Sequence, residues 1–433
     1  MSAGNRPYIS EIVKKIREVQ DIQQEVLARK SLIHRTTISA IENGVKECSD
    51  EQWLDIKTAM GIEHLPIDEN ERDDFRDMLY GWYDVISERD WEKAKEMQKY
   101  LSVITLVPQD VELYSLFVLF ECRVQIAHNE LETAEKTLDE FARKLDELDH
   151  NVLYHYYYNR GTFNFMKDSI ENSLDFYLKT SKLAKRDYEN NATLHYAISR
   201  CHERLGYYAK SADLLEVAIL QNHTGRGGVL EFYLYNSLGK NYAVTGHLHR
   251  AREILKKALD LAEKLYEKNP NPETKAQIGL VHLNYGLIYR KEKKWRRAIH
   301  CQDEALQYFE RGTNDALTAI YQKLRCSMEI RRYPAYKDLL EEAIELSKGN
   351  EPYTVLFEMF KCMANINKDS ARHMETKILP YLIDKTYMYT AFECCEFLRD
   401  YHVKHGRVPN AREHEVLMQL NIIRSRIHEG GIM

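Results

Sequence analysis

The chain has 433 residues, of which 44% are hydrophobic and 30% are charged, a balance that is typical of a folded protein and excludes a disordered one. The 61 basic and 67 acidic residues give a formal net charge of −6, so any binding to DNA must come from a local basic patch. With 18 glycines and 9 prolines, the chain has too few turn residues for β-sandwiches, barrels or Rossmann folds, and we expect an all-α protein.

Residues 1–66 are predicted to form a compact bundle of four short helices. The third helix spans His34–Asn43 and ends at Gly44, and Ser49 caps the fourth helix with Gln52 completing a capping box. The inward side chains of the first and fourth helices are predicted to be Ile9, Ile12, Val13, Ile16, Val19, Trp53, Leu54, Ile56 and Met60.

A helix-turn-helix pattern lies within this bundle. The segment Gln24–Ala28 is followed, after five residues, by the segment His34–Gly44, and this spacing resembles the Xre/Cro-type repressors. Leu32 occupies the turn position at which that family usually has glycine, so we expect a strained or reshaped turn. The N-terminal end of the second helix reaches base edges in such motifs. The residues predicted to contact DNA are Gln24, Lys30, His34, Arg35, Thr36 and Ser39.

Charge separates this region from the rest of the chain. Residues 1–46 carry eight basic and five acidic side chains, a net charge of +3, which is the local positive charge that DNA binding needs. The acidic segment 67–75, IDENERDDF, is predicted to be a linker. It would join the DNA-binding domain, residues 1–66, to a second domain over residues 76–433.

The second domain shows a repeat close to the tetratricopeptide period. Small residues recur where two helices would cross, as in the sets Gly239, Ala251, Ala258 and Gly286, Ala298, Ala305. We expect about nine helix pairs, starting near residues 69, 110, 151, 191, 230, 273, 316, 353 and 389. Such pairs bury their outer stripes against one another, which predicts a right-handed superhelix with a concave inner wall.

Polar residues at inward positions of the first helix of each pair form a candidate ligand site. Asn236 and Lys240 lie one helical turn apart in the best-formed repeat, and Tyr196 occupies the position of Asn236 one pair earlier. Asparagine can hold the backbone of an extended peptide, and a basic residue can bind its carboxylate. The residues predicted to bind a peptide are Asn159, Arg200, Glu203, Asn236, Lys240, Asn284, Tyr321 and Arg325. The choice among Lys240, Arg200 and Arg325 for the carboxylate stays open.

No catalytic, metal-binding or cofactor-binding pattern is apparent. The eight cysteines are scattered without a C-x-x-C pair, which predicts reduced thiols, and the glycine-rich segment Thr224–Gly228 lacks the lysine of a phosphate loop. The sequence contains neither a run of about 18 apolar residues nor an apolar N-terminal signal. We therefore expect a cytoplasmic, non-enzymatic protein without contact to a membrane.

The combination of motif and repeats resembles the RRNPP-type peptide-pheromone receptors of Gram-positive bacteria, the Rap, Rgg, NprR, PlcR and PrgX proteins, and the related arbitrium receptors. The resemblance implies a homodimer that binds a short signalling peptide in its groove and a double-stranded DNA operator. It also implies that inner-face asparagines hold the peptide, a role that Asn159, Asn236 and Asn284 would match. The alternative is a Rap-like protein that sequesters or dephosphorylates a response regulator without binding DNA. The helix-turn-helix pattern favours the first interpretation.

Overall fold

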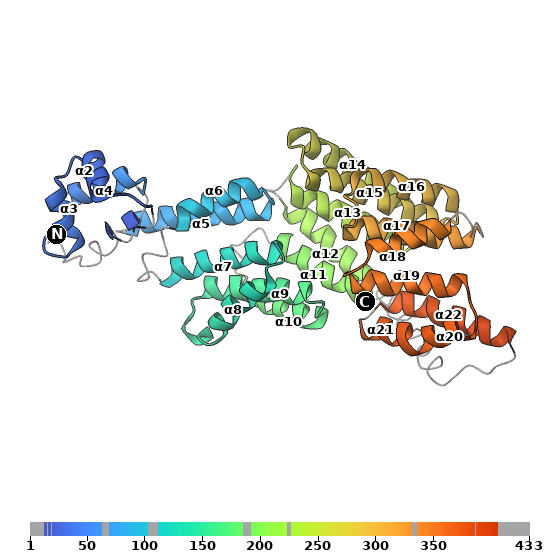
Figure 1. The fold of residues 1–433 in the computed structure, drawn as a ribbon. Helices are drawn as coiled ribbons and strands as arrows, with labels where there is room; N and C mark the ends of the chain where they lie inside the picture. The colour runs from blue at the N-terminus through green and yellow to red at the C-terminus, as the bar shows by residue number, and fades with distance from the viewer. Residues whose placement is uncertain are drawn as a thin grey trace. The chain divides into compact units, whose positions relative to one another are not determined.

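The computed structural model describes residues 13–14, 16–18, 20–62, 69–102, 111–184, 192–222, 227–330, 336–385 and 387–405. Within these ranges every regular element is a helix, as the composition predicts, and none is a strand (Figure 1). The chain divides into two compact units. The first contains Met1–Lys167 and Lys179–Leu183, and the second contains Asp168–Leu178 and Ala184–Met433.

The N-terminal bundle contains helices α2 (Gln24–Ser31), α3 (Arg35–Glu42) and α4 (Asp50–Met60). The predicted capping box is present, because the Ser49 hydroxyl accepts from Gln52 N at 3.2 Å and Gln52 Oε1 accepts from Ser49 N at 3.3 Å. The bundle core contains Val13, Ile16, Leu27, Ile33, Ile38, Ile41, Trp53, Ile56, Met60 and Ile62. Ile9, Ile12 and Val19, which we also expected to face inward, lie outside the described residues.

Leu54 was assigned wrongly to the apolar face of α4. Its side chain is 56% exposed, whereas Trp53, Ile56 and Met60 are buried. Those three residues follow an i, i+3, i+7 pattern, which fills one stripe of the helix. One step along a helix turns the side chain by about 100°, so Leu54 faces solvent.

The expected linker is mostly helical. Helix α5 (Glu69–Ser87) begins inside the acidic segment, and Phe75 is only 2% exposed in the core of the first repeats. The segment that we expected to be a linker therefore contributes a core residue to the repeats.

The repeats are helix pairs joined by short turns. The first unit contains the pairs α5 with α6 (Trp91–Leu101) and α7 (Val111–Ala127) with α8 (Leu131–Ala142), then the 3₁₀ turn η2 (Leu145–Glu147) and helix α9 (His150–Met166). Helix α10 (Ile170–Leu183) is next in the chain, and its residues up to Leu178 belong to the second unit. In the second unit the pairs are α11 (Ala192–Arg204) with α12 (Tyr208–Gln221), α13 (Val229–Val244) with α14 (Leu248–Lys268), α15 (Pro272–Lys291) with α16 (Trp295–Tyr308), and α17 (Asn314–Glu329) with α18 (Lys337–Leu346). Helix α19 (Glu351–Ala364) follows, paired with a continuous stretch formed by α20 (Lys368–His373), the π-helix η4 (Met374–Ile378) and α21 (Leu379–Asp384), and then α22 (Met388–Lys404).

All nine predicted pair starts lie within two residues of a helix start, from Glu69 to Met388. The agreement follows from local signals, because each pair begins after a turn and carries its small residues at a fixed offset. The partner that we expect for α22 lies outside the described residues.

Small residues allow the paired helices to approach closely, as the repeat pattern predicts. Ala251 and Ala258 are fully buried between α13 and α14. A Cβ atom added to Gly239 would lie 2.6 Å from Leu255 Cδ2, closer than real Cβ atoms come to a neighbour. Leu255 is itself fully buried, so it has little room to move away.

We therefore expect Gly239→Ala to lower the free energy of unfolding by about 1–3 kcal/mol, the usual range for overpacking a core. Gly81→Ala is the matched control, because Gly81 is also inside a helix but its added Cβ would meet nothing within 4 Å. The control should stabilise by about 0.5–1 kcal/mol. Urea denaturation of both variants tests this difference in sign, and equal shifts would contradict it.

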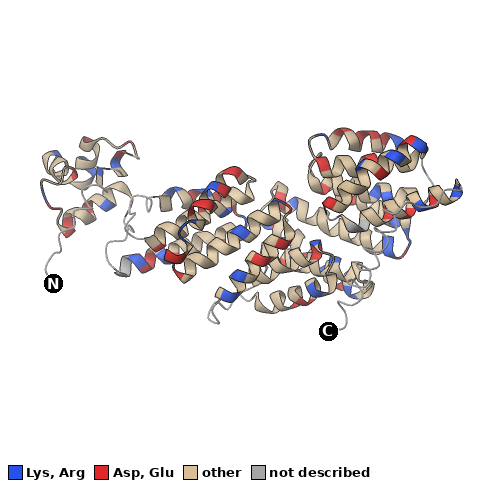
Figure 2. Cartoon of the chain, turned by 90° about the horizontal axis from the view of Figure 1, so that it is seen from below, with Lys and Arg blue, Asp and Glu red and all other residues tan. Residues whose placement is uncertain are grey.

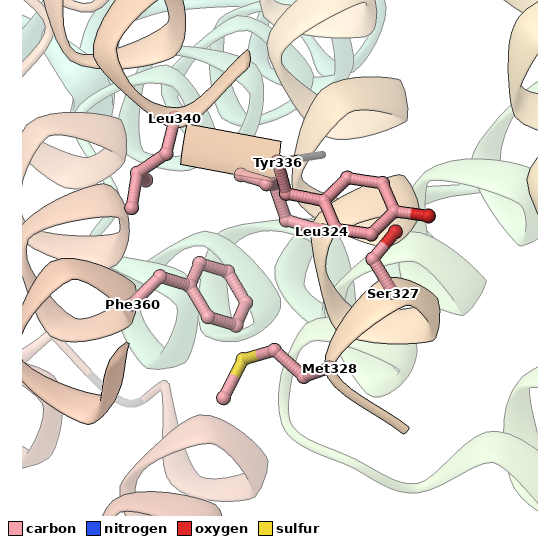
Figure 3. Close-up of a pocket in the computed structure, with 6 residues that line it drawn as sticks. All are labelled: Leu324, Ser327, Met328, Tyr336, Leu340 and Phe360. Atoms are coloured by element: carbon pink, nitrogen blue, oxygen red, sulfur yellow. The ribbon is translucent and has the colours of Figure 1, made fainter. Parts of the chain in front are cut away.

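A small cavity lies between α17, α18 and α19 in the second unit (Figure 3). Its volume is about 10 Å³, which at most accommodates one water molecule. The labelled side chains of Leu324, Ser327, Met328, Tyr336, Leu340 and Phe360 surround it. It is a packing void within the apolar core and offers no room for a ligand.

Candidate DNA-binding surface and inner-face cluster

The N-terminal end of α3 presents the predicted DNA-contacting residues to solvent. His34, Arg35 and Thr36 are exposed, and Ser39 is half-buried one turn further along the helix. His34 caps α3, because its Nδ1 accepts from the backbone N–H of Thr36 at 3.4 Å. Lys30 is exposed in the last turn of α2. Basic and acidic residues are interspersed along the helices, as the colouring of Figure 2 shows.

A buried carboxylate organises the bundle behind this surface. Glu42 Oε1 accepts from Arg17 Nε at 2.7 Å, and Glu42 Oε2 accepts from Arg17 Nη2 at 3.1 Å and from Gln24 Nε2 at 2.7 Å. The Glu42 side chain is only 2% exposed. Its hydrogen bond raises the pKa of Arg17 above its ordinary value. Glu42 therefore orients the amide of Gln24, a residue that we predicted to contact DNA.

The turn between α2 and α3 is strained rather than reshaped, the first of the two outcomes that we expected from Leu32. Leu32 has φ 56° and ψ 19°, the left-handed region that disfavours L-residues because their Cβ atom comes close to the following carbonyl oxygen. Its side chain is 92% exposed and so gains little from burial. The backbone geometry of the motif is thus kept without its usual glycine.

We expect Leu32→Gly to raise the free energy of unfolding by roughly 0.5–1 kcal/mol. Relief of the left-handed strain contributes about 1–2 kcal/mol, and the extra freedom of glycine in the unfolded chain offsets about half of that. Leu32→Ala keeps the strain and is the control. Denaturation midpoints of the two variants give the comparison, and a Leu32→Gly protein no more stable than Leu32→Ala would contradict the strain.

The second unit brings five of the predicted peptide-contacting residues and Tyr196 together on α11, α13 and α15. We call Tyr196, Arg200, Glu203, Asn236, Lys240 and Asn284 the inner-face cluster. Lys240 Nζ donates to Glu203 Oε1 at 2.5 Å, and Arg200 Nη1 donates to the Tyr196 hydroxyl at 3.2 Å. The Lys240–Glu203 contact joins α13 to α11, the first helices of consecutive pairs, whereas the Arg200–Tyr196 bond lies within α11.

The two asparagines of the inner-face cluster bind each other. Asn284 Nδ2 donates to Asn236 Oδ1 at 2.8 Å, which links α15 to α13. Asn236 is 8% exposed and Asn284 is 6% exposed, so both lie at the edge of the interior. The bond occupies the nitrogen of one amide and the oxygen of the other. The remaining amide groups form a donor and an acceptor side by side.

Burial and neighbouring charges perturb the ionisable members of the inner-face cluster. Burial opposes ionisation of Glu203, but Lys240 and Arg200 together hold the pKa of its carboxyl below the ordinary value. The Tyr196 hydroxyl and Glu203 raise the pKa of Arg200. Burial would lower the pKa of Lys240, but Glu203 raises it above the ordinary value. All three groups therefore stay charged at neutral pH.

The other three predicted peptide-contacting residues have different surroundings. Asn159, in the first unit, is 2% exposed and its amide donates to the carbonyl of Leu119 at 2.6 Å. Tyr321 is 7% exposed and lies in the hydrophobic core shared by α17, α19 and α22. Arg325 forms an ion pair with Glu393 of α22. Packing of α22 onto α17 thus gives Tyr321 and Arg325 partners within the protein.

Two further residues have the character of site residues and were missed from the sequence. Asp315 of α17 is half-buried, and burial raises its pKa despite the opposing charge of Arg200. In the first unit the Arg123 guanidinium lies 4.4 Å from the centre of the Tyr158 ring and 5.7 Å from that of Tyr83. Neither has a sequence signal, because a single charged residue in a helix ordinarily faces solvent.

The described ranges contain no group of three or more His, Cys, Asp or Glu side chains placed to hold a metal ion. The helices described here include none that is both long and apolar enough to cross a membrane.

Comparison with known proteins relates both parts of the chain to regulators. Residues 13–65 match the Helix-turn-helix family. The chain is 22% identical to the transcriptional activator NprA of Geobacillus stearothermophilus over 395 residues, which cover 86% of this chain and 93% of NprA. It is 23% identical to response regulator aspartate phosphatase I of Bacillus subtilis (strain 168) over 256 residues, 55% of this chain and 62% of the phosphatase.

The fold is shared with a solved receptor structure. The crystal structure of NprR in complex with its cognate peptide NprX superposes with a TM-score of 0.63 at 17% identity, and the match covers 80% of this chain and 99% of NprR. The chain is thus similar along its length to a transcriptional activator, carries a helix-turn-helix match at its N-terminal end and shares the fold of NprR.

Proposed function

We propose that the chain is a cytoplasmic quorum-sensing transcription regulator. Its N-terminal bundle binds a double-stranded DNA operator, its repeats bind a short signalling peptide at the inner-face cluster, and the peptide alters DNA binding. The observation that carries this proposal is the presence in one chain of an exposed recognition-helix terminus and a polar cluster that spans three repeats. The similarity along the length of NprA, a transcriptional activator, supports it.

The DNA-binding part follows from the geometry of α3. Arg35 and Thr36 lie at the exposed N-terminal end, where side chains of a recognition helix reach base edges. We propose that Lys30 and Gln24 contact the DNA backbone. One such domain reads a single half-site, so specific binding requires two copies about one helical turn apart. We therefore propose a homodimer.

The peptide-binding part follows from the inner-face cluster. Asn236 Nδ2 and Asn284 Oδ1 can bind one C=O and one N–H of an extended peptide, whose backbone groups must be paired when water leaves. Lys240 is 40% exposed on its side chain and is the accessible cation beside them. We propose that Lys240 binds the peptide's carboxylate, which the negative charge of Glu203 would otherwise repel.

Peptide and DNA binding must be coupled through two states of the protein. A ligand shifts an equilibrium only by its different affinity for the two states. The stacked repeats can supply such states, because small rotations between neighbouring pairs add along the array. The inner-face cluster spans three pairs, so a peptide bound there would change those rotations directly.

The phosphatase relative supports a second candidate function, in which the chain would capture or dephosphorylate a response regulator. The alignment with that relative covers 62% of its length, whereas the alignment with NprA covers 93%. Residues 13–65 give this chain a DNA-binding module, and regulation of transcription uses that module, whereas the second function leaves it without a role.

Footprinting tests the proposal on the full chain. Purified protein is incubated with sheared genomic DNA from its source, with and without spent culture medium, and protected sites are sequenced. We expect a small set of sites with two-fold symmetry whose occupancy changes with medium. Arg35→Ala should lose these sites, with a cost of about 1–3 kcal/mol if Arg35 contacts a base. Uniform protection of all DNA, unchanged by Arg35→Ala, would contradict the proposal.

Asn236→Ala is expected to weaken peptide binding by about 1–3 kcal/mol, because it leaves a peptide group buried without a partner. The probe is the synthetic peptide encoded beside the gene, titrated by calorimetry. Tyr235→Phe on the neighbouring helical position is the control, since it changes a polar group outside the inner-face cluster. Equal affinities for wild type and Asn236→Ala would remove Asn236 from the site.

A further inference from the structure

We propose that Glu25 is a positioning residue for Arg35 and thereby determines which base pair the recognition helix selects. The inference rests on the proposed function, because it concerns how the bundle would read DNA. Glu25 was not among the residues predicted from the sequence, where it is an acidic residue within a basic region.

The two side chains come from different helices and meet at the exposed surface. Glu25 is the second residue of α2 and Arg35 is the first residue of α3. Arg35 Nη1 lies 2.8 Å from Glu25 Oε1, and the side chains are 60% and 61% exposed. An exposed ion pair of this kind adds at most about 1 kcal/mol to stability, so folding alone gives little reason for it.

The contact leaves Arg35 suited to one kind of base. With Nη1 held by Glu25, the Nε–Nη2 edge of the guanidinium still carries two parallel donors. Two such donors match O6 and N7 of a guanine in the major groove. A guanidinium that is already oriented also loses less rotamer freedom when it binds.

A hydrogen bond to the buried Glu42 holds the start of α2, where Glu25 lies. Its neighbour Gln24 is bound to the buried Glu42, which also holds Arg17. The start of α2 is therefore anchored to the end of α3, the helix that carries Arg35. This anchoring holds the backbone of Glu25 against α3, and the Glu25 carboxylate contacts Arg35 in its first turn.

The charge of Glu25 contributes to selectivity in a second way. A carboxylate at a DNA-facing surface repels phosphates, and it is tolerated only while a cation covers it. Arg35 covers it when its guanidinium is held in the observed geometry. DNA that draws Arg35 elsewhere exposes the carboxylate, so Glu25 penalises incorrect sites more than the correct one.

The test begins by selecting the best site from a random duplex library with the full wild-type chain. The base pair read by Arg35 is the one at which Arg35→Ala loses discrimination. We expect Glu25→Gln to reduce discrimination at that base pair about fivefold, the lower end of what a bidentate contact contributes, and to leave other positions unchanged. Affinity for random duplex should rise.

Two controls separate positioning from a simple loss of charge. Glu51→Gln removes one exposed carboxylate from the same bundle and should leave discrimination at every position unchanged. In an Arg35→Ala background, Glu25→Gln should have no further effect at the identified base pair. Unchanged discrimination in Glu25→Gln, or an effect that persists without Arg35, overturns the inference. If the wild-type chain enriches no sequence, the proposed DNA-binding function fails as well.

Discussion

Glu42→Ala is expected to unfold the N-terminal bundle at temperatures where the repeats stay folded. Removing one partner of a buried ion pair typically destabilises by about 3–5 kcal/mol, since it leaves the other charge buried without compensation. Arg17 would lose both hydrogen bonds to Glu42, and its side chain is 15% exposed. A domain of some 50 residues has a total stability of about 3–8 kcal/mol, so the loss is a large share of it.

Hydrogen exchange of amides in α2, α3 and α4 measures this effect separately from the repeats. Glu25→Gln breaks an exposed ion pair in the same bundle and should change protection by less than about 1 kcal/mol. The double variant Arg17→Met, Glu42→Leu removes both charges and should recover most of the stability. Protection in Glu42→Ala equal to that in Glu25→Gln would show that the buried pair is not a stabilising contact.

His155 is expected to make the first unit sensitive to acid. Its imidazole is 4% exposed and packs 4.8 Å from Phe120 and 5.0 Å from Tyr83, measured between ring centres. Burial, together with the nearby charge of Arg123, lowers the pKa of His155 to about 3. Below pH 6.5 the unfolded chain therefore binds a proton that the folded chain does not.

The direction of the pH dependence of stability follows from this difference in protonation. The contribution of His155 to stability is complete above about pH 6.5 and is lost as pH falls toward about 3, by roughly 1.4 kcal/mol per pH unit. Between pH 7 and pH 4.5 the loss amounts to about 2–3 kcal/mol. His155→Phe keeps the aromatic packing and cannot bind the proton, so it should remove this dependence.

Urea denaturation of wild type and His155→Phe at a series of pH values gives the difference between the two proteins. Taking the difference cancels the titration of carboxylates, which are common to both. We expect the difference in unfolding free energy to shift in favour of His155→Phe as pH falls. Parallel stability curves from pH 7 to pH 4.5 would show that the folded protein protonates His155 as readily as the unfolded chain does.

Most features of the candidate DNA-binding surface could be predicted from the sequence, because the residues that determine them are close together in the chain. The capping box at Ser49, the end of α3 before Gly44 and the left-handed turn at Leu32 each depend on residues within four positions. The exposure of Arg35 follows from helical periodicity once Ile38 and Ile41 face the core. The pairing of Arg35 with Glu25 could not be predicted from the sequence, because it depends on how α2 and α3 cross.

The inner-face cluster shows the same division. Periodicity placed Arg200, Glu203, Asn236 and Lys240 on first helices, and in the structure Lys240 pairs with Glu203 and Asn236 binds Asn284. It also placed Tyr321 and Arg325 at equivalent positions, yet both contact α22. A repeat alignment treats every pair as identical, whereas the neighbours of a residue change along the array.

The sequence alone determined the class of this protein: an all-α chain with a helix-turn-helix bundle and nine helix-pair starts, each within two residues of its observed position. These features follow from hydrophobic period, capping residues and small residues at crossings, which act within a turn or a pair. Only the tertiary structure decided that Asn236 binds Asn284, that Glu42 orients Gln24, and that His155 is enclosed by aromatic rings. Those contacts join residues 18 to 48 positions apart, or several helices at once. Their geometry depends on the crossing angle between helices and the rotation between repeats, which no local pattern specifies.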